Sequence, residues 1–255
     1  MSEIHPRATA FDGAAEAYER GRPDWPVAAL GAAAARLGLG ADAVVADLAA
    51  GTGKLTRALA ARWANVVAIE PLDGMRAVLA RALPDVRALA GRAEAIPLAD
   101  GSVDAVFVGE AFHWFDAPRA AAELARVVRA GGGVAVLYNR APWGEAPEPW
   151  LREVSDLLDG LKVRGDGVDP EATRPWHDAL EAAVGPLAAD TFDHVQSMSA
   201  EDFVALIASF SWMAAMPDDG RTAALDRIRA VLARHGIETA RIEYRTELTT
   251  ARRCR

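Results

Sequence analysis

The first 139 residues alternate between short apolar runs and stretches with helical periodicity. The apolar runs are typical of buried parallel strands and lie at 44–47, 65–70, 86–90, 102–109 and 134–138. Apolar residues recur at helical spacing between these runs, over 26–38, 54–62, 73–83 and from Pro118 to the glycines at 131–133. This order predicts an α/β domain in which helices cover both faces of a parallel sheet.

The pattern changes after residue 139. Prolines interrupt polar helical stretches that contain Trp143, Trp150 and Trp176, which predicts a helical insertion over 140–185. Further strands are predicted at 187–196 and 241–250, with helices between them at 200–213 and 218–234. We expect one domain over 1–255, divided into an N-terminal segment at 1–24, a core at 25–139, the insertion, and the last strands and helices at 186–255.

A glycine turn follows the first predicted strand, in the sequence Asp47-Leu48-Ala49-Ala50-Gly51-Thr52-Gly53. Gly51 and Gly53 allow a backbone to approach a ligand where a Cβ would collide with it. A phosphate-binding P-loop needs glycine at position 48 and Ser or Thr at position 55, and both positions hold leucine. The dinucleotide fingerprint needs a small residue where Thr56 stands, which disfavours a nicotinamide cofactor without excluding it.

Three more segments place polar or aromatic residues after predicted strands. Glu70 ends the second strand about 20 residues after Gly51, the offset at which Rossmann-like folds bind ribose hydroxyls with a carboxylate, although a plain surface acid fits the same place. Residues 91–98 follow the third strand, and the aromatic segment 110–116 follows the fourth. Because open α/β sheets bind ligands at the carboxyl ends of their strands, we expect a site there. A hydrophobic plug under the next helix is the alternative for 110–116.

Composition narrows the class of partner. The net charge of −8 disfavours nucleic acid, whose binders usually carry clustered Lys and Arg. The single Cys254 cannot form an internal disulfide, which fits a reducing cytoplasm. We find no signal peptide, no apolar run near the roughly 20 residues that a membrane span needs, and no metal-ligand spacing. The sequence therefore predicts a cytoplasmic protein without metal, membrane or nucleic-acid partners, and its oligomeric state stays open.

The motifs and their order resemble the class I S-adenosylmethionine-dependent methyltransferases, in particular the small-molecule enzymes of the type 11 group. Their first motif, D-x-G-x-G-x-G, corresponds here to Asp47, Ala49, Gly51 and Gly53. The resemblance implies a Rossmann-like, doubly wound, seven-stranded and mostly parallel sheet whose last strand is antiparallel. It also implies S-adenosyl-L-methionine as cofactor and S-adenosyl-L-homocysteine as product.

Roles for the residues after the second and third strands follow from the same resemblance. Glu70 would contact the ribose, Pro71 would also bind the cofactor, and Met75 would lie against the adenine, unless Met75 is simply a core residue. The loop resembling G-D-A-E-x-L-P-F would bind adenine through Arg92, Ala93 and Glu94. Arg92 replaces the usual aspartate, whereas Ala93 can still offer its backbone N–H to a ring nitrogen.

The N-terminal segment resembles the F-x-Y-x-x-x-R-P-x-Y-P lid of small-molecule methyltransferases, with Phe11, Tyr18, Arg22 and Trp25 at its marked positions. In that role Tyr18 and Arg22 would contact the cofactor, with Tyr18 nearest its methionine portion. A docking arm whose aromatic side chains fill a gap on the core explains the same residues.

Segment 110–116 resembles the Q-A-x-H-W-F-D sequence that borders the transferable methyl group. Glu110 stands in place of Gln and would change the charge near the sulfonium, so we count it as both cofactor-binding and catalytic. His113 is the other candidate general base, and Phe112, His113 and Trp114 would bind a small-molecule methyl acceptor. O-, C- and carboxyl-methylation stay open. The other hypotheses are a catalytically silent S-adenosylmethionine-binding regulatory protein and, disfavoured by Thr56, a nicotinamide-dependent oxidoreductase.

Overall fold

The computed structural model describes residues 15–161 and 176–254, so Phe11 of the predicted lid and the middle of the predicted insertion lie outside the described residues. The chain forms two compact units. The first, which we call the sheet unit, comprises Asp24–Asn139, Pro170–Asp193 and Arg245–Arg255. The second, the helical unit, comprises Met1–Pro23, Arg140–Asp169 and His194–Tyr244. Each unit is considered by itself below.

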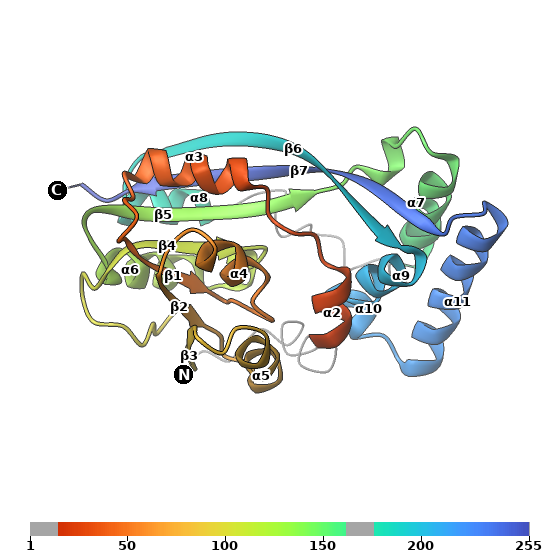
Figure 1. Ribbon diagram of the computed structural model, residues 1–255, viewed down its shortest axis with the longest axis horizontal. Coiled ribbons are helices and arrows are strands. Elements are labelled where there is room, and N and C mark those ends of the chain that lie inside the picture. The colour runs from red at the N-terminus through yellow and green to blue at the C-terminus, as the bar shows by residue number, and fades with distance from the viewer. Residues whose placement is uncertain (1–14, 162–175, 255) are drawn as a thin grey trace. The chain divides into compact units, whose positions relative to one another are not determined.

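Seven strands form one sheet in the order β3-β2-β1-β4-β5-β7-β6 (Figure 1). They are β1 Val44–Leu48, β2 Asn65–Ile69, β3 Arg87–Leu89, β4 Val103–Gly109, β5 Val128–Arg140, β6 Leu187–Ser199 and β7 Thr239–Arg252. The four pairings from β3 to β5 are parallel, and the last strands are antiparallel. The predicted Rossmann-like fold is confirmed.

The strand order reverses between β1 and β4, and open α/β sheets bind ligands outside the carboxyl ends of the strands at such a point. Leu48 is paired with Ile69 of β2, and Asp47 with Phe107 of β4. The segments that leave β1, β2 and β4 therefore begin side by side at one edge of the sheet.

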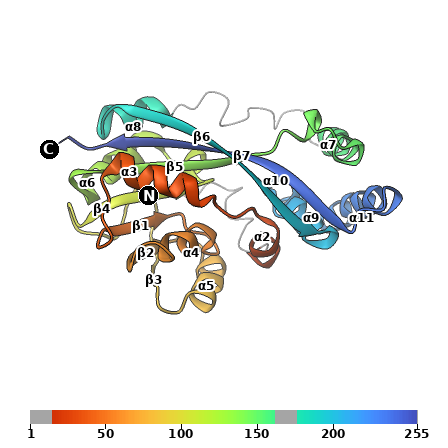
Figure 2. The same cartoon turned by 45° about the horizontal axis from the view of Figure 1, so that its top comes forward.

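Helices cover both faces of the sheet unit because its strands are apolar on both sides. Val45 of β1 and Phe107 of β4 pack with α3 (Val27–Leu37) and α4 (Lys54–Ala60). Helix α5 (Asp73–Ala82) lies beside α4, near β2 and β3 (Figures 1 and 2). The alternate residues pack with α6 (Ala117–Val127) and α8 (Trp176–Ala183).

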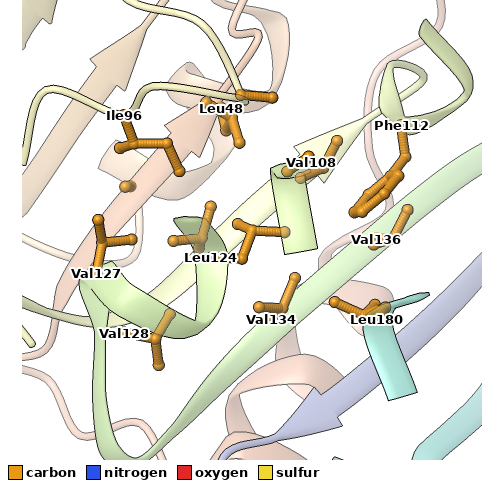
Figure 3. Packing of buried hydrophobic residues seen from close by; sticks show 14 of the residues in the cluster. Leu48, Ile96, Val108, Phe112, Leu124, Val127, Val128, Val134, Val136 and Leu180 are labelled. Carbon is orange, nitrogen blue, oxygen red and sulfur yellow. The ribbon is translucent and has the colours of Figure 1, made fainter. Parts of the chain in front are cut away.

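The hydrophobic cluster against α6 and α8 is continuous. Val108, Val134 and Val136 of the sheet meet Leu124 of α6 and Leu180 of α8 (Figure 3). All of these side chains are at most 1% exposed. Since burial of each such side chain contributes about 1.5–3 kcal/mol, the cluster gives the edge of the sheet a rigid base.

Glycines 131–133 belong to β5, so the prediction that they end the preceding helix was wrong. Helix α6 ends at Val127, and β5 begins at Val128 with a register shift opposite β4 between Val103 and Ala105. A Cβ on Gly132 would collide with the carbonyl oxygen of Asp104. These glycines therefore allow a close approach of strands.

The helical unit contains α2 (Ala15–Gly21), a 3-10 turn at Trp143–Glu145, α7 (Pro149–Leu161), α9 (Ala200–Ala208), α10 (Ser211–Ala214) and α11 (Asp218–Arg234). Trp150, Phe203 and Ile228 lie in its core. One helix was predicted over 200–213, but the structure has two, because α9 ends before the buried Ser209 and α10 begins at Ser211. The Ser209 hydroxyl donates to the Leu206 carbonyl at 2.6 Å and accepts from Arg22 Nε at 3.0 Å, which stabilises the break.

Candidate functional site

The turn after β1 has left-handed backbone conformations at three positions. The φ angles are +57° at Ala49, +57° at Gly51 and +95° at Gly53. Gly53 is the N-cap of α4, and a Cβ there would lie 3.0 Å from Leu79 Cγ. The left-handed conformation costs alanine about 1–2 kcal/mol of free energy, whereas it costs glycine almost nothing. The backbone therefore favours glycine at positions 51 and 53, independently of any ligand.

Glu70 holds this turn from the neighbouring strand end. Its Oε2 accepts the Gly51 N–H at 2.9 Å, and its Oε1 accepts the Leu72 N–H at 2.9 Å. Glu70 is only 5% exposed, and Arg76 of α5 donates to its carbonyl at 2.8 Å and to that of Pro71 at 3.4 Å. A buried carboxylate that accepts backbone N–H groups is fixed in place. Its oxygens can accept further bonds, so the predicted ribose contact fits this geometry.

Asp47 and Thr56 form a buried pair beneath the turn. Thr56 Oγ1 donates to Asp47 Oδ2 at 2.5 Å, and both residues are at most 1% exposed. Burial raises the pKa of Asp47 to about 7; the Thr56 hydrogen bonds oppose this rise, and the charge of Glu70 adds to it. In the sequence, Thr56 mattered only as a departure from the dinucleotide fingerprint. The structure gives it a partner in the first motif.

We expect the stability of the protein to depend on Asp47 in a pH-dependent way. The folded-state pKa of about 7 lies above the unfolded value of roughly 3.9, so the folded state binds the proton more tightly between these values. The free-energy cost of burying the ionised Asp47 carboxylate is therefore absent below about pH 4 and complete above about pH 7. Relative to Asp47→Asn, the parent should lose free energy of unfolding as the pH rises across this window. Urea denaturation of both proteins at several pH values measures this, and a constant difference would contradict it.

The loop after β3 is compact and contacts the segment after β4. Ala93 is buried, and the Ala95 N–H donates to the Arg92 carbonyl at 3.1 Å. Glu94 Oε1 accepts the Asp116 N–H at 3.0 Å. The carboxylate of Glu94 is therefore engaged with the end of the aromatic segment, a contact that the sequence did not indicate.

The aromatic segment contains a 3-10 turn at Phe112–Trp114. Phe112 is fully buried and stacks on Trp176 of α8 with ring centroids 5.0 Å apart. His113 and Trp114 are half-buried, with ring centroids 4.5 Å apart. Phe112 thus anchors the segment in the core, as the plug interpretation expected, while its two neighbours remain partly accessible.

His113 contacts a tyrosine that the sequence analysis did not select. The His113 backbone N–H donates to Tyr138 Oη at 3.3 Å, and the ring Nδ1 lies 3.4 Å from the same oxygen. Tyr138 is 2% exposed and lies near the end of β5. Its position gave a usable signal, because Asp47 and Glu70 are also polar groups at the ends of apolar strands.

Glu110 is held in a strained conformation. Its φ is +57°, and it shares a positive φ only with Ala49 among the non-glycine residues that the structure describes. Glu110 Oε1 accepts the Asn139 N–H at 2.5 Å. Strained residues of this kind cluster at functional sites, and these two follow β1 and β4, the strands that flank the reversal.

Three further predicted site residues are Met75, Tyr18 and Arg22. Met75 belongs to the sheet unit and is buried on α5. Tyr18 and Arg22 belong to the helical unit. The Arg22 guanidinium donates to the Ser209 carbonyl at 3.1 Å and lies 5.0 Å from the Tyr18 ring centroid. Their contact with a cofactor stays a prediction.

No group of three or more His, Cys, Asp or Glu residues that could hold a metal ion occurs within 15–161 and 176–254. In the same ranges, no helix has both the length and the apolar character needed to cross a bilayer.

The fold and the site define a class: an open α/β sheet with a strained glycine turn, a strand-end acid and an aromatic segment around the point where the strand order reverses. A family model described as a methyltransferase domain matches residues 46–136. An uncharacterized methyltransferase of Mycobacterium bovis is 40% identical over 231 residues, which are 88% of this chain and 86% of that protein. The chain belongs to the class I S-adenosylmethionine-dependent methyltransferases.

Solved structures share this fold. The structure of a putative type II methyltransferase from Anaeromyxobacter dehalogenans superposes with a TM-score of 0.67 at 22% identity, covering 91% of this chain and 97% of that one. Phosphoethanolamine N-methyltransferase 2 of Haemonchus contortus, solved with phosphomonomethylethanolamine and S-adenosylhomocysteine, superposes with a TM-score of 0.54 at 14% identity, covering 100% of this chain and 61% of that one.

Proposed function

We propose that this protein transfers a methyl group from S-adenosyl-L-methionine to a small-molecule acceptor. The observation that carries the proposal is the bond between the Glu70 carboxylate and the Gly51 N–H at 2.9 Å, which joins the strand-end acid to the glycine turn. A carboxylate fixed beside a turn that has glycine at positions 51 and 53 suits a ribose together with a ligand chain that passes close to the backbone. The Haemonchus enzyme, solved with S-adenosylhomocysteine, lends support at the level of the fold.

In this proposal the ends of the first three strands hold the cofactor. Gly51 and Gly53 belong to the turn that would face the methionine portion, and Glu70 accepts the ribose hydroxyls. Met75 and Pro71 flank the purine. The Ala93 N–H donates to a ring nitrogen of the adenine, with Arg92 and Glu94 shaping the same loop.

Bound S-adenosylmethionine supplies an electrophilic methyl group, and the side chains have to align a nucleophile with it and exclude water. His113 and Trp114 are partly accessible residues of the aromatic segment and would line the acceptor side. Nδ1 of His113 lies 3.4 Å from Tyr138 Oη, and the imidazole of His113 is the group that would receive an acceptor proton. Glu110 places a carboxylate where the usual glutamine is neutral. An acceptor that is a phenol, a hydroxyl or a carbon acid would use His113 or Glu110 as general base, whereas a carboxylate acceptor would need no base.

Replacement of Glu70 tests the cofactor site directly. Glu70→Ala should weaken S-adenosylhomocysteine binding by about 1–3 kcal/mol, because charge-assisted hydrogen bonds to the ribose are lost and the Gly51 N–H loses its acceptor. Isothermal titration calorimetry gives the affinity, and circular dichroism reports whether the fold survives.

Asp73→Ala is the matched control for this experiment. Asp73 is an acid three residues further on, with a side chain that is 89% exposed. It should bind S-adenosylhomocysteine like the parent. If Glu70→Ala also binds as tightly as the parent, the ribose role of Glu70 is wrong.

A further inference from the structure

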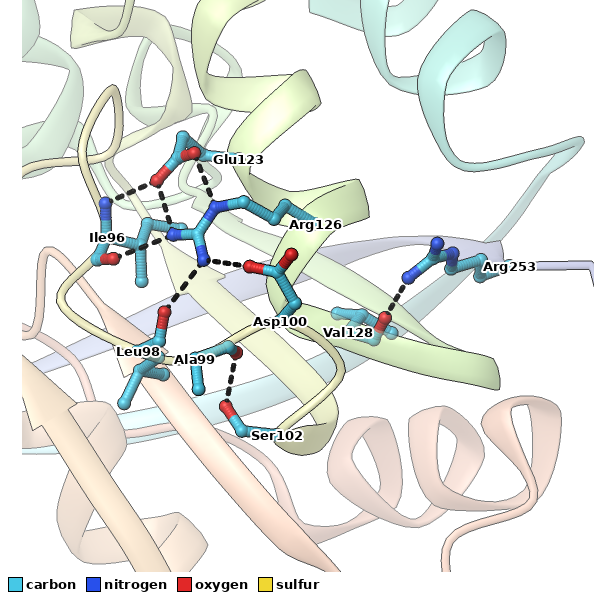
Figure 4. Close-up of polar contacts among 9 residues, drawn as sticks. All are labelled: Ile96, Leu98, Ala99, Asp100, Ser102, Glu123, Arg126, Val128 and Arg253. Carbon is cyan, nitrogen blue, oxygen red and sulfur yellow. Dashed lines mark hydrogen bonds and ion pairs between the residues drawn. The ribbon is translucent and has the colours of Figure 1, made fainter.

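Two charged residues of α6 hold the loop that follows β3 (Figure 4). The Arg126 guanidinium donates to the carbonyls of Leu98 at 2.8 Å and Ile96 at 2.9 Å. It also donates to Asp100 Oδ1 at 2.7 Å. Glu123 Oε2 accepts the Ile96 N–H at 2.7 Å. One turn of a helix thus binds three backbone groups and one side chain of the loop.

The two residues also bind each other. Arg126 Nε donates to Glu123 Oε1 at 2.7 Å, and a second guanidinium nitrogen donates to Oε2 at 2.8 Å. Hydrogen bonds from Arg126 lower the pKa of the Glu123 carboxyl, which keeps both partners charged at neutral pH. A planar guanidinium in such a fork loses little further freedom when it binds the loop carbonyls. The pair is therefore a rigid clamp.

The clamp acts on the segment to which the proposed function assigns the purine. Ile96 lies two residues after Glu94, in the same loop as Arg92 and Ala93. At the other end of α6, the N-cap residue Asp116 donates its N–H to Glu94 at 3.0 Å. The loop is thus attached to both ends of one helix, and the buried Ala93 directly precedes the first attached residue, Glu94.

We propose that Arg126, supported by Glu123, is a positioning residue for purine recognition; this inference rests on the proposed function. A backbone N–H can distinguish one purine from another by hydrogen bonding only if the loop that carries it stays in position. Adenine offers an unprotonated N1 as acceptor, whereas a 6-oxopurine carries a hydrogen on N1 and would place a donor against a donor. Leaving such a pair unsatisfied costs about 1–3 kcal/mol, or roughly 5–150-fold in affinity. A fixed loop maintains this discrimination. A loop that can shift moves the N–H away from the purine N1 hydrogen and so reduces the discrimination.

The test compares S-adenosylhomocysteine with its inosine counterpart, in which the 6-amino group is an oxo group, by calorimetry on the full chain. The parent should bind the adenine compound at least about 10-fold more tightly, and Arg126→Gln should reduce this ratio to about 2-fold. Arg126→Lys keeps the charge but not the fork, and should give an intermediate ratio. Arg119→Gln, on an exposed position of the same helix, is the control and should keep the parent ratio.

The ratio separates positioning from simple destabilisation, since a merely structural role would weaken both ligands equally. The inference is overturned if Arg126→Gln, or Arg126→Lys where the glutamine variant does not fold, weakens both ligands with an unchanged ratio. A parent that binds both compounds equally also overturns it. A parent that binds neither compound overturns the proposed function itself, and the inference with it.

Discussion

Gly51→Val should abolish binding of S-adenosylmethionine and S-adenosylhomocysteine, with an affinity loss of at least about 1,000-fold. Gly51 has a φ of +57° and donates its N–H to Glu70 in the turn after β1. In the proposed function the ligand chain passes close to the backbone of this turn, where valine would add branched carbon atoms. Calorimetry measures the binding, and urea denaturation measures the stability.

The left-handed conformation itself complicates this experiment, because valine at positive φ costs about 1–3 kcal/mol wherever it occurs. Gly101→Val is the matched control. Gly101 has a φ of +59° and lies before the amino end of β4, at the opposite edge of the sheet from the turn. A Cβ there would lie 3.7 Å from Arg129 Cα, an ordinary contact. Both variants should lose similar stability, and only Gly51→Val should lose the cofactor. Equal binding by the two variants would contradict the assignment of the turn.

His113→Ala should lower turnover by about 100- to 10,000-fold if His113 is a general base, and much less if it only positions the acceptor. Cofactor affinity should hardly change, because the purine and ribose are assigned to residues after β2 and β3. The acceptor is first identified by a product screen with methyl-labelled cofactor. Turnover and affinity are then measured on the same preparations.

Two further variants separate the roles of the ring. His113→Gln retains a hydrogen-bonding group without a base, so it should remain as slow as His113→Ala if proton removal matters. Tyr138→Phe removes the hydroxyl that lies 3.4 Å from Nδ1, and it should lower turnover while leaving the cofactor affinity intact. A His113→Ala protein that loses cofactor binding but keeps its turnover at saturation would show that the segment faces the cofactor.

The sheet could be predicted from the sequence because its strands are short, apolar on both faces and followed by chemically distinctive residues. Asp47 and Glu70 show this most clearly, since each ends an apolar run. The glycines at 131–133 were misassigned because a helix end and a close strand crossing both favour glycine. Only the position of the Asp104 carbonyl in the folded protein distinguishes the two.

The side-chain partners of the site were less predictable. Thr56 bonds to Asp47 because α4 turns back over β1, and Tyr138 meets His113 because β5 lies beside β4. The spacing of these residues in the sequence predicts neither contact. Arg126 was the least predictable of these residues. Its bonds to Ile96 and Leu98 span about 30 residues of chain, and in the sequence Arg126 looks like an ordinary charged residue of a helix.

Calorimetric titration of the parent protein with S-adenosylhomocysteine, beside a parallel titration with NADH, tests the central claim most directly. We expect saturable binding of S-adenosylhomocysteine with a dissociation constant of about 1–100 μM, and no heat of binding from NADH. The absence of heat and of thermal stabilisation with S-adenosylhomocysteine at about 1 mM, together with saturable binding of NADH, would contradict the account.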